Sequence, residues 1–400
     1  MGELTRGERA AIERLDAARM LARVERWAAI NSGTRHLAGC AAMADALADA
    51  FADLPGTVTL VDPAAAESVA ADGSVTALEH GRHLRVTVRP EARVQLLLTG
   101  HLDTVYPVDH PFQTLTWCEP GVLNGPGVAD MKGGLALMLE ALLAVEASGA
   151  DLGYEVIVNS DEETGSFSSA ALLADAARGK VAALTYEPAL PDGTLAGARG
   201  GTGNFSIVVR GRAAHAGRNP GDGRNAIVAA SALALRLHAA RTPRLAVNPA
   251  RIDGGGPNNV VPDLAVLRVN FRPADAAEIA RAQALVAQAA AEVAAVHEVE
   301  VTVHGGFNRP PKPIDPGAAR LFALVRDSGA ALGQPIAWRD TGGVCDGNNI
   351  AACGVPVVDT MGARGGAIHS ADEFLIVDSL HERAALSAVT MLRIAGGALA

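Results

Sequence analysis

The stretch LLLTGHLDTVYP, residues 96–107, decides the fold. Small or apolar residues run from Leu96 to Gly100 and lead into His101 and Asp103. Side chains two positions apart on a strand point to the same face, so we expect these two polar groups on one side of the chain. A continuous apolar run is typical of a strand that is buried on both faces of an α/β sheet. We therefore predict a central strand that ends in a polar site.

The same order of apolar strand and acidic residues recurs downstream. Strands are predicted at 154–159 and in VAALTYEPA, and the acids that follow them are Asp161, Glu162, Glu163 and Glu187. Between the central strand and these segments, LNGPGVADMKGG places Asp130 among glycines before a helix predicted at 133–149. Ligands bind at the carboxyl ends of strands in open α/β sheets, so these acids are expected to meet at one site.

The pattern changes between residues 197 and 306. The predicted elements follow the split βαβ order of a ferredoxin-like module, and they are strand 204–212, helix 225–240, strand 245–252, strand 263–272, helix 274–296 and strand 299–304. Because this set is complete by itself, we predict an inserted domain at 197–306 between two parts of a catalytic domain, 1–196 and 307–400. Elsewhere we expect helices at 8–30, 41–54 and 317–332, a glycine-rich loop at 341–349 and a final helix from Asp378.

Charge, cysteine content and the lack of long apolar segments argue against a nucleic-acid-binding, secreted or membrane protein. The net charge is −10 and no run of Lys or Arg could follow a phosphate backbone, which argues against nucleic acid as a partner. The four cysteines are scattered, as expected in a reducing compartment. The charged N-terminus lacks an apolar signal core, and no stretch is expected to reach the apolar length of a membrane span. We expect a cytoplasmic protein with no membrane partner.

The polar residues at the strand ends suit a metal site. Imidazole and carboxylate groups without a thiolate favour Zn²⁺, with Co²⁺ or Mn²⁺ as alternatives. Closely spaced carboxylates repel each other unless cations neutralise them, so the excess of acids suggests two metal ions. Each cluster alone has a structural alternative: a hydrogen-bonded His–Asp pair, or an acidic helix N-terminus. The glycines around Asp130 lack the GxxxxGK[ST] spacing of a phosphate loop.

Six motifs together resemble a known family. They are GHLDTVYP, GPGVADMKGG, NSDEETGS, YEP, GRAAHAGRNPGDGRNAI and IHSADEF. From about residue 90 to the end, the chain is similar to the dinuclear zinc metallopeptidases, which include bacterial glutamate carboxypeptidase, succinyl-diaminopimelate desuccinylase, acetylornithine deacetylase and aminoacylase. HxDTVY, DEExGSF and HAG most resemble the glutamate carboxypeptidase branch. The resemblance implies a zinc-peptidase-like mixed sheet flanked by helices, with a ferredoxin-like lid that also forms a homodimer.

The resemblance also implies a role for each site residue. The implied metal ligands are His101 and Glu187 for one ion, Glu163 and His369 for the other, and Asp130 between them. Asp103 would orient the His101 ring, and a cis peptide would follow Asp130. A hydroxide bridging the two metals would attack the amide carbonyl, with Glu162 as general base. His215 would reach the active site of a partner subunit and stabilise the oxyanion.

Substrate-binding residues are also implied. Arg272 matches a family arginine that binds a substrate carboxylate, and Asn258 and Asn259 fall in a polar lid loop. The loop that contains Gly343 departs from the family, because the carboxypeptidase has Arg directly before TGGG and this chain has Arg339 and then Asp340. Either Arg339 takes the role of that arginine or Asp340 replaces it with an acid, so specificity for a C-terminal glutamate stays open.

The predicted function is metal-dependent hydrolysis of an amide bond in a small N-acyl amino acid or short peptide with a free carboxylate. One alternative is an aminoacylase, another deacylase or an N-carbamoyl amidohydrolase of the same fold. An alternative of another class is a non-catalytic metal- or ligand-binding protein, although Glu162 would then have no use as a base.

Overall fold

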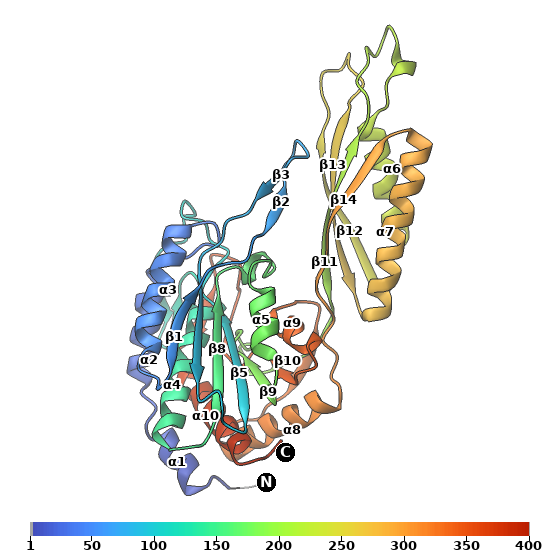
Figure 1. The fold of residues 1–400 in the computed structure, drawn as a ribbon. Coiled ribbons are helices and arrows are strands. Elements are labelled where there is room, and N and C mark those ends of the chain that lie inside the picture. Colours follow the sequence, from blue (N-terminus) through green and yellow to red (C-terminus); the bar gives the residue numbers. More distant parts are fainter. Residues whose placement is uncertain (1–2, 400) are drawn as a thin grey trace.

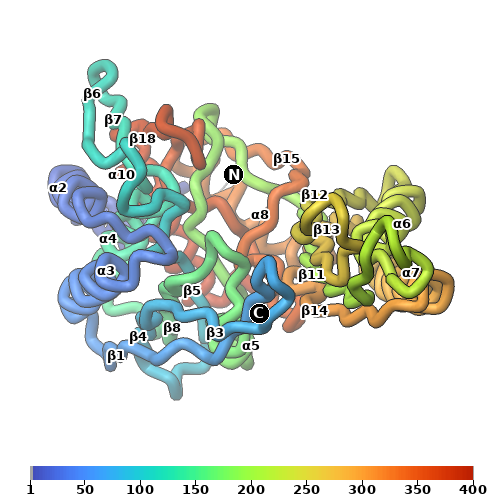
Figure 2. Tube along the Cα trace, turned by 90° about the horizontal axis from the view of Figure 1, so that it is seen from above, coloured from blue at the N-terminus to red at the C-terminus, as the bar shows by residue number. Residues whose placement is uncertain are grey.

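The computed structural model describes residues 3–399 and has two units (Figure 1). The larger unit is a mixed sheet covered by helices, and the smaller is a four-stranded sheet with two helices. Seen from above, the smaller unit lies to one side of the larger (Figure 2). This arrangement confirms the α/β class with an appended lid. The domain boundaries at residues 197 and 306 stay a prediction.

The central sheet has six strands in the order β1-β4-β8-β5-β9-β16. Their bounds are β1 (Thr57–Val61), β4 (His83–Val88), β8 (Gly153–Asn159), β5 (Gln95–His101), β9 (Ala182–Thr185) and β16 (Val357–Val358). β4 runs antiparallel to its two neighbours, whereas β8, β5, β9 and β16 are parallel. β5 is buried from Leu96 to His101, as predicted. The carboxyl ends of β5, β8 and β9 therefore lie side by side at one edge.

Helices cover both faces of this sheet because successive residues of a buried strand point to opposite sides. Leu96 and Leu98 pack into the larger core, which is covered by α2 (Ala17–Ala28), α3 (Leu37–Phe51), α4 (Gly134–Ala147), α8 (Pro316–Ala331) and α10 (Ser379–Ala395). Leu97 packs into a smaller core with α5 (Ala170–Ala177) and α9 (Asp346–Ala352). Short strands complete the unit: β6 (Thr116–Glu119), β7 (Val122–Asn124), β10 (Leu195–Arg199), β15 (Trp338–Thr341), β17 (Gly365–Gly366) and β18 (Phe374–Ile376).

The structure corrects three predicted elements. The helix expected at 8–30 is divided into α1 (Arg6–Ile12) and α2, because the carboxylate of Asp16 accepts the backbone N–H of Arg19 and begins a new helix. The helix expected at 41–54 begins earlier, at Leu37. The loop expected at 341–349 ends in helix α9, where the Asn348 side chain accepts the backbone N–H of Cys345.

The lid follows the predicted strand and helix order. It consists of β11 (Thr202–Arg210), α6 (Ala226–Ala239), β12 (Leu245–Gly254), β13 (Leu264–Pro273), α7 (Ala276–His297) and β14 (Glu300–Arg309). The sheet order is β12-β13-β11-β14 with antiparallel neighbours, as in a ferredoxin-like module. The first and last strands, β11 and β14, join the lid to the larger unit (Figure 1).

Helix α7 corrects the expectation about membrane-length segments. By length and composition alone, this helix could cross a membrane. In the structure, Ala282, Val286 and Val293 on one face of the helix are buried in the lid core. The helix therefore has a packing role in the lid. The cytoplasmic location inferred from the sequence stays a prediction.

A hairpin of the larger unit, β2 (Glu67–Val69) and β3 (Val75–Ala77), reaches across to the lid (Figure 1). Val69 packs in a small buried cluster with Val208 and Val266 of the lid sheet. A guanidinium nitrogen of Arg268 donates to the carbonyl of Val69 at 2.8 Å. The hairpin was not predicted from the sequence, and it holds the lid against the larger unit.

Candidate metal centre

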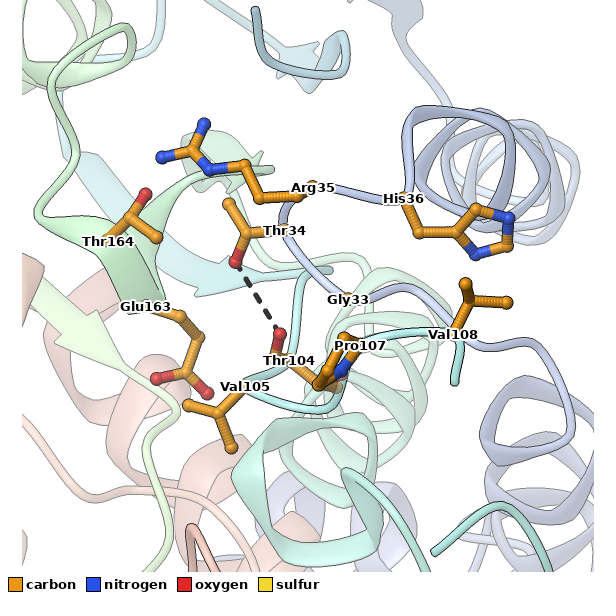
Figure 3. Close-up of a pocket in the computed structure, with 10 residues that line it drawn as sticks. All are labelled: Gly33, Thr34, Arg35, His36, Thr104, Val105, Pro107, Val108, Glu163 and Thr164. Atoms are coloured by element: carbon orange, nitrogen blue, oxygen red, sulfur yellow. Dashed lines mark hydrogen bonds between the residues drawn. The ribbon is translucent and has the colours of Figure 1, made fainter. Parts of the chain in front are cut away.

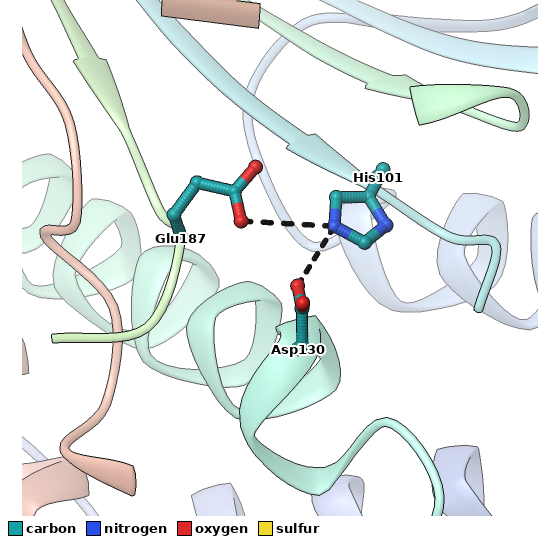
Figure 4. A group of neighbouring side chains, drawn as sticks. All are labelled: His101, Asp130 and Glu187. Carbon is teal, nitrogen blue, oxygen red and sulfur yellow. Dashed lines mark hydrogen bonds and ion pairs between the residues drawn. The ribbon is translucent and has the colours of Figure 1, made fainter. Parts of the chain in front are cut away.

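His101 lies at the carboxyl end of β5 and begins the first group of candidate metal ligands. Its Nε2 atom is 3.0 Å from Oδ1 of Asp130 and 3.8 Å from Oε2 of Glu187 (Figure 4). The imidazole is 1% exposed. Three side chains that are far apart in the sequence thus meet here. They come from β5, the turn before α4 and the segment after β9.

A second group lies on the other side of Asp130. Nε2 of His369 is 3.3 Å from Oδ2 of Asp130 and 3.1 Å from Oε2 of Glu163. The two oxygens of the Asp130 carboxylate therefore face different histidines. Within each group the ligand atoms all lie within 4.8 Å of one another. A carboxylate placed in this way can bridge two cations, and the bridging role of Asp130 stays a prediction.

Hydrogen bonds to the Glu373 carboxylate fix the turn that carries Asp130, η1 (Val128–Gly133). The Asp130–Met131 peptide is cis, which confirms that expectation. The backbone N–H groups of Ala129 and Asp130 each donate to Oε1 of Glu373 at 3.0 Å. Glu373 is buried and was not predicted as a site residue. Its position in IHSADEF, close to His369, is the one signal in the sequence.

Asp103 was predicted to orient the His101 ring, and it also contacts Thr34 and the turn after β8. Nδ1 of His101 lies 2.9 Å from the backbone carbonyl of Asp103 and 3.5 Å from its carboxylate, so the carbonyl is the closer acceptor for the ring. The carboxylate accepts the backbone N–H groups of Glu162 at 3.2 Å and Glu163 at 3.3 Å, and the hydroxyl of Thr34 at 2.7 Å. Asp103 therefore ties the turn after β8 to the end of β5.

Glu162 is paired with a buried arginine that the sequence did not indicate. Oε1 of Glu162 is 2.7 Å from Nη2 of Arg309, the last residue of β14. Asp346, at the start of α9, lies 3.5 Å from the same nitrogen and accepts a hydrogen bond from the Ser166 hydroxyl at 2.5 Å. All three charged side chains are buried. No motif identified Arg309, because its partners lie far away in the sequence.

Burial and the nearness of other acids raise the pKa values of carboxylates in the site. Burial, and then the charge of Asp130, raise the pKa of Glu163 to about 7. Burial raises the pKa of Glu162 well above its usual range, although the charge of Arg309 opposes the shift. Hydrogen bonds to Asp130 and Glu163 raise the pKa of His369 to about 11. A set of buried acids that resist ionisation in this way is stabilised by divalent cations, so the donor atoms fit the predicted metals.

The other predicted lid residues fall into two places. His215 and the loop with Asn258 and Asn259 lie together at the tip of the lid, where the backbone N–H of Ala216 donates to the carbonyl of Asn259 at 2.9 Å. This tip points away from the larger unit (Figure 1). The structure of a single chain therefore does not bring His215, Asn258 or Asn259 to the metal ligands.

Arg272 lies near the root of the lid instead. It is exposed, and its Nε donates to the side-chain oxygen of Asn270 at 2.9 Å. Burial and then the nearby charge of Arg309 lower the pKa of Arg272, which places these two arginines within electrostatic reach of each other. Among residues 3–399, no carboxylate lies within ion-pair distance of Arg272. The guanidinium is thus free to contact an added anion.

Strand β15, which precedes Gly343, forms one wall of a small cavity of about 150 Å³, lined in part by Arg339, Thr341 and Pro188. Oδ1 of Asp340 accepts the backbone N–H of Ala198 at 2.8 Å, so this acid has a structural partner. Pro188 directly follows Glu187 in the chain. The lining therefore includes the residue that follows a ligand of the first group, and none of the three ligands.

Most of the chain is similar to known proteins. Residues 97–393 match the model of Peptidase family M20/M25/M40. The chain belongs to this family. It is 30% identical to carboxypeptidase G2 of Pseudomonas sp. (strain RS-16) over 316 residues, which cover 76% of this chain and 74% of the relative. The succinyl-diaminopimelate desuccinylase of Pseudomonas syringae pv. syringae (strain B728a) is 28% identical over 309 residues, covering 71% and 78% of the two chains.

Solved structures of the family share the fold. The crystal structure of a dinuclear metal-binding M20 peptidase from Bacillus subtilis superposes with a TM-score of 0.67 and 14% identity, covering 95% of this chain and 98% of that one. Family membership establishes that the chain is a metallohydrolase that acts on amide bonds, and confirms the resemblance seen in the sequence. The individual residue roles stay a prediction.

Proposed function

We propose that this enzyme hydrolyses the amide bond of a small N-acyl amino acid or short peptide with a free carboxylate. The observation that carries the proposal is the position of Asp130, whose two oxygens face two separate ligand groups beside Glu162. His101 and Glu187 would hold one divalent ion, and Glu163 and His369 the other. When bound, two such ions lower the pKa of water and polarise a carbonyl oxygen. Zinc is the metal expected first.

Glu162 is proposed to accept the proton of the attacking water and to return it to the departing amine. Its backbone is fixed by the hydrogen bond to Asp103, and its carboxylate by the ion pair with Arg309. Because the residue is buried next to a ligand without belonging to either ligand group, it can move a proton while the metals stay bound.

Two arginines, Arg272 and Arg339, are proposed to bind the free carboxylate of the substrate. Arg272 is exposed and without an acidic partner among residues 3–399, and a planar guanidinium suits two-point binding of a carboxylate. Arg339, in β15, lines the small cavity together with Pro188, and Gly343 follows β15 two residues later. We assign Arg272 and Arg339 as the candidate anchors, and Asn259 as a further contact from the lid tip.

His215 is proposed to act on a second copy of the chain. Its Nδ1 accepts the backbone N–H groups of Gly217 and Arg218, each at 3.1 Å, so the neutral ring carries its proton on Nε2. That N–H can donate to the oxyanion formed in the transition state. Since the tip of the lid points away from its own metal ligands, a homodimer through the lid would supply His215 to the other active site (Figure 1).

The proposal is tested by a hydrolysis screen over N-acyl amino acids, N-carbamoyl amino acids, dipeptides and folate-like glutamate conjugates, each with Zn²⁺, Co²⁺ and Mn²⁺. The two relatives named above act, by their names, as a carboxypeptidase and a desuccinylase, so both types of acyl group belong in the screen. We expect turnover of substrates with a free carboxylate. Analogues in which a carboxamide replaces that carboxylate should be hydrolysed much more slowly. Preference for simple acyl or carbamoyl groups would favour the deacylase or carbamoylase alternative. Metal binding without any turnover would favour the non-catalytic alternative.

A further inference from the structure

A second cavity, to which the proposed function has so far given no role, opens beside Glu163 (Figure 3). Its volume is about 460 Å³. Three segments line it: 33–36 before α3, 104–108 after β5, and 163–164 after β8. Glu163 belongs both to this lining and to the second group of metal ligands. The cavity therefore borders one side chain of the candidate metal centre.

The walls of this cavity are fixed to the end of β5. The backbone N–H of Thr34 donates to the carbonyl of Thr104 at 3.2 Å, and that of Thr104 donates to the carbonyl of Ser32 at 3.0 Å. A Cβ atom on Gly33 would lie 2.3 Å from the carbonyl oxygen of Tyr106, so this close approach requires glycine. The segment that carries Arg35 is thus held at a defined position relative to the metal ligands.

The lining combines an apolar surface with one cation. Val105, Pro107 and Val108 form the apolar part, and Val108 is 60% exposed. The guanidinium of Arg35 lies on the same side of the cavity as Thr164 and Glu163 (Figure 3). Its contact with the protein is one hydrogen bond, from Nη1 to the carbonyl of Glu79 at 3.2 Å. Within residues 3–399 no carboxylate is in ion-pair range of Arg35, so most of its donors stay available.

The two cavities are lined by different residues. The smaller one, with the proposed anchor Arg339, is lined by Pro188, the residue that follows Glu187 in the chain. The larger one borders Glu163 and Thr164. If the amino-acid half of the substrate is held on the Glu187 side, the acyl half must extend past Glu163 into the larger cavity.

We propose that the cavity formed by 33–36, 104–108 and 163–164 binds the acyl group, and that Arg35 selects acyl chains that end in a carboxylate. The apolar residues would contact the methylene groups, and the Arg35 guanidinium would pair with the terminal anion. This assignment rests on the proposed function, since it names the acyl group of the same amide substrate.

The first test compares matched substrates. N-succinyl-, N-glutaryl- and N-adipoyl-L-glutamate are measured against the neutral N-butyryl-, N-pentanoyl- and N-hexanoyl-L-glutamate, in wild type and in Arg35→Met. We expect a higher kcat/KM for at least one diacid than for its neutral counterpart. Arg35→Met should reduce that ratio by about tenfold while the neutral substrates keep their kcat/KM, because one charged hydrogen-bonding partner is lost. Arg35→Lys should retain part of the ratio.

Arg93→Met serves as the matched control, since Arg93 is an exposed arginine at the opposite end of β5. It should leave the ratio unchanged. Equal ratios in wild type and Arg35→Met would overturn the assignment of Arg35.

A binding measurement keeps the two proposals distinguishable. Calorimetric titration of succinate, glutarate, adipate and hexanoate into zinc-loaded Glu162→Gln protein, with and without Arg35→Met, needs no turnover. Tighter binding of a diacid that is lost in Arg35→Met would support the cavity assignment even if no amide were hydrolysed, in which case the proposed function alone would fail. Diacid binding that is absent, or that does not depend on Arg35, would overturn the cavity assignment even in an active amide hydrolase.

Discussion

The end of β5 and the tip of the lid both carry candidate site residues, but only those at the end of β5 meet within one chain. At the end of β5, one chain brings together His101, Asp130 and Glu187 in a buried group, and Asp103 ties in the Glu162 turn. His215 is exposed and lies at the tip of the lid, which points away from the larger unit. The candidate metal centre is a property of a single folded chain, whereas the role proposed for His215 would need another copy of the chain. The following predictions test this difference.

The largest effect is expected from Glu162→Gln, which removes the proposed base and keeps both ligand groups. Loss of a general base costs about 10²–10⁴-fold in rate, so kcat should fall within that range. The metal content should match that of wild type, because Glu162 belongs to neither group. Steady-state kinetics and elemental analysis of the same sample check this. A variant with near-normal kcat would refute the role of Glu162.

Arg309→Met should be the most destabilising of these changes. Glu162 and Asp346 would be left as buried acids without a cation, and breaking a buried pair of this kind costs about 3–5 kcal/mol. The melting temperature should fall clearly, and activity should fall as well. Arg326→Met is the control, because the Arg326–Asp327 pair is exposed at 58% and 65% and should contribute little. Equal melting temperatures for both variants would contradict the importance of the Arg309 pair.

Mixing two inactive variants tests the lid directly. In a dimer of one Glu162→Gln chain and one His215→Ala chain, one site has both Glu162 and a His215 from the partner. Random pairing should therefore restore about a quarter of the wild-type activity per chain. Heterodimers are isolated with two different affinity tags. Inactivity of the isolated heterodimer would show that His215 does not act in trans.

The smallest effect is expected at the hairpin between the two units. Gly73 has φ +72°, and a Cβ atom there would meet Val208 of the lid at 2.9 Å. Gly149 has φ +74° with open space around it, so Gly149→Ala reproduces the backbone strain alone. Gly73→Ala should lower the melting temperature further than Gly149→Ala and speed hydrogen exchange in β11 and β13. Identical behaviour would mean that the hairpin does not hold the lid.

The sequence predicted the parts of the site that follow from short-range order. A buried strand followed at once by His or an acid identified His101, Asp103, Glu163 and Glu187, and the ferredoxin-like order of the lid followed from its own periodicity. Glu373 and Arg309 were missed, because each acts on residues that lie far away in the sequence and neither belongs to a strand–acid motif. The β2–β3 hairpin was missed for a similar reason. Its strands have three residues each, too short for a clear alternating pattern, and its position depends on the lid.

The central claim, that one chain holds two metal ions through Asp130, is tested most directly by elemental analysis of the zinc-loaded protein after removal of free metal. The arrangement of the two ligand groups predicts about two zinc ions per chain in wild type, and fewer than one in Asp130→Asn. No bound zinc in wild type, or equal zinc in Asp130→Asn, would contradict the account.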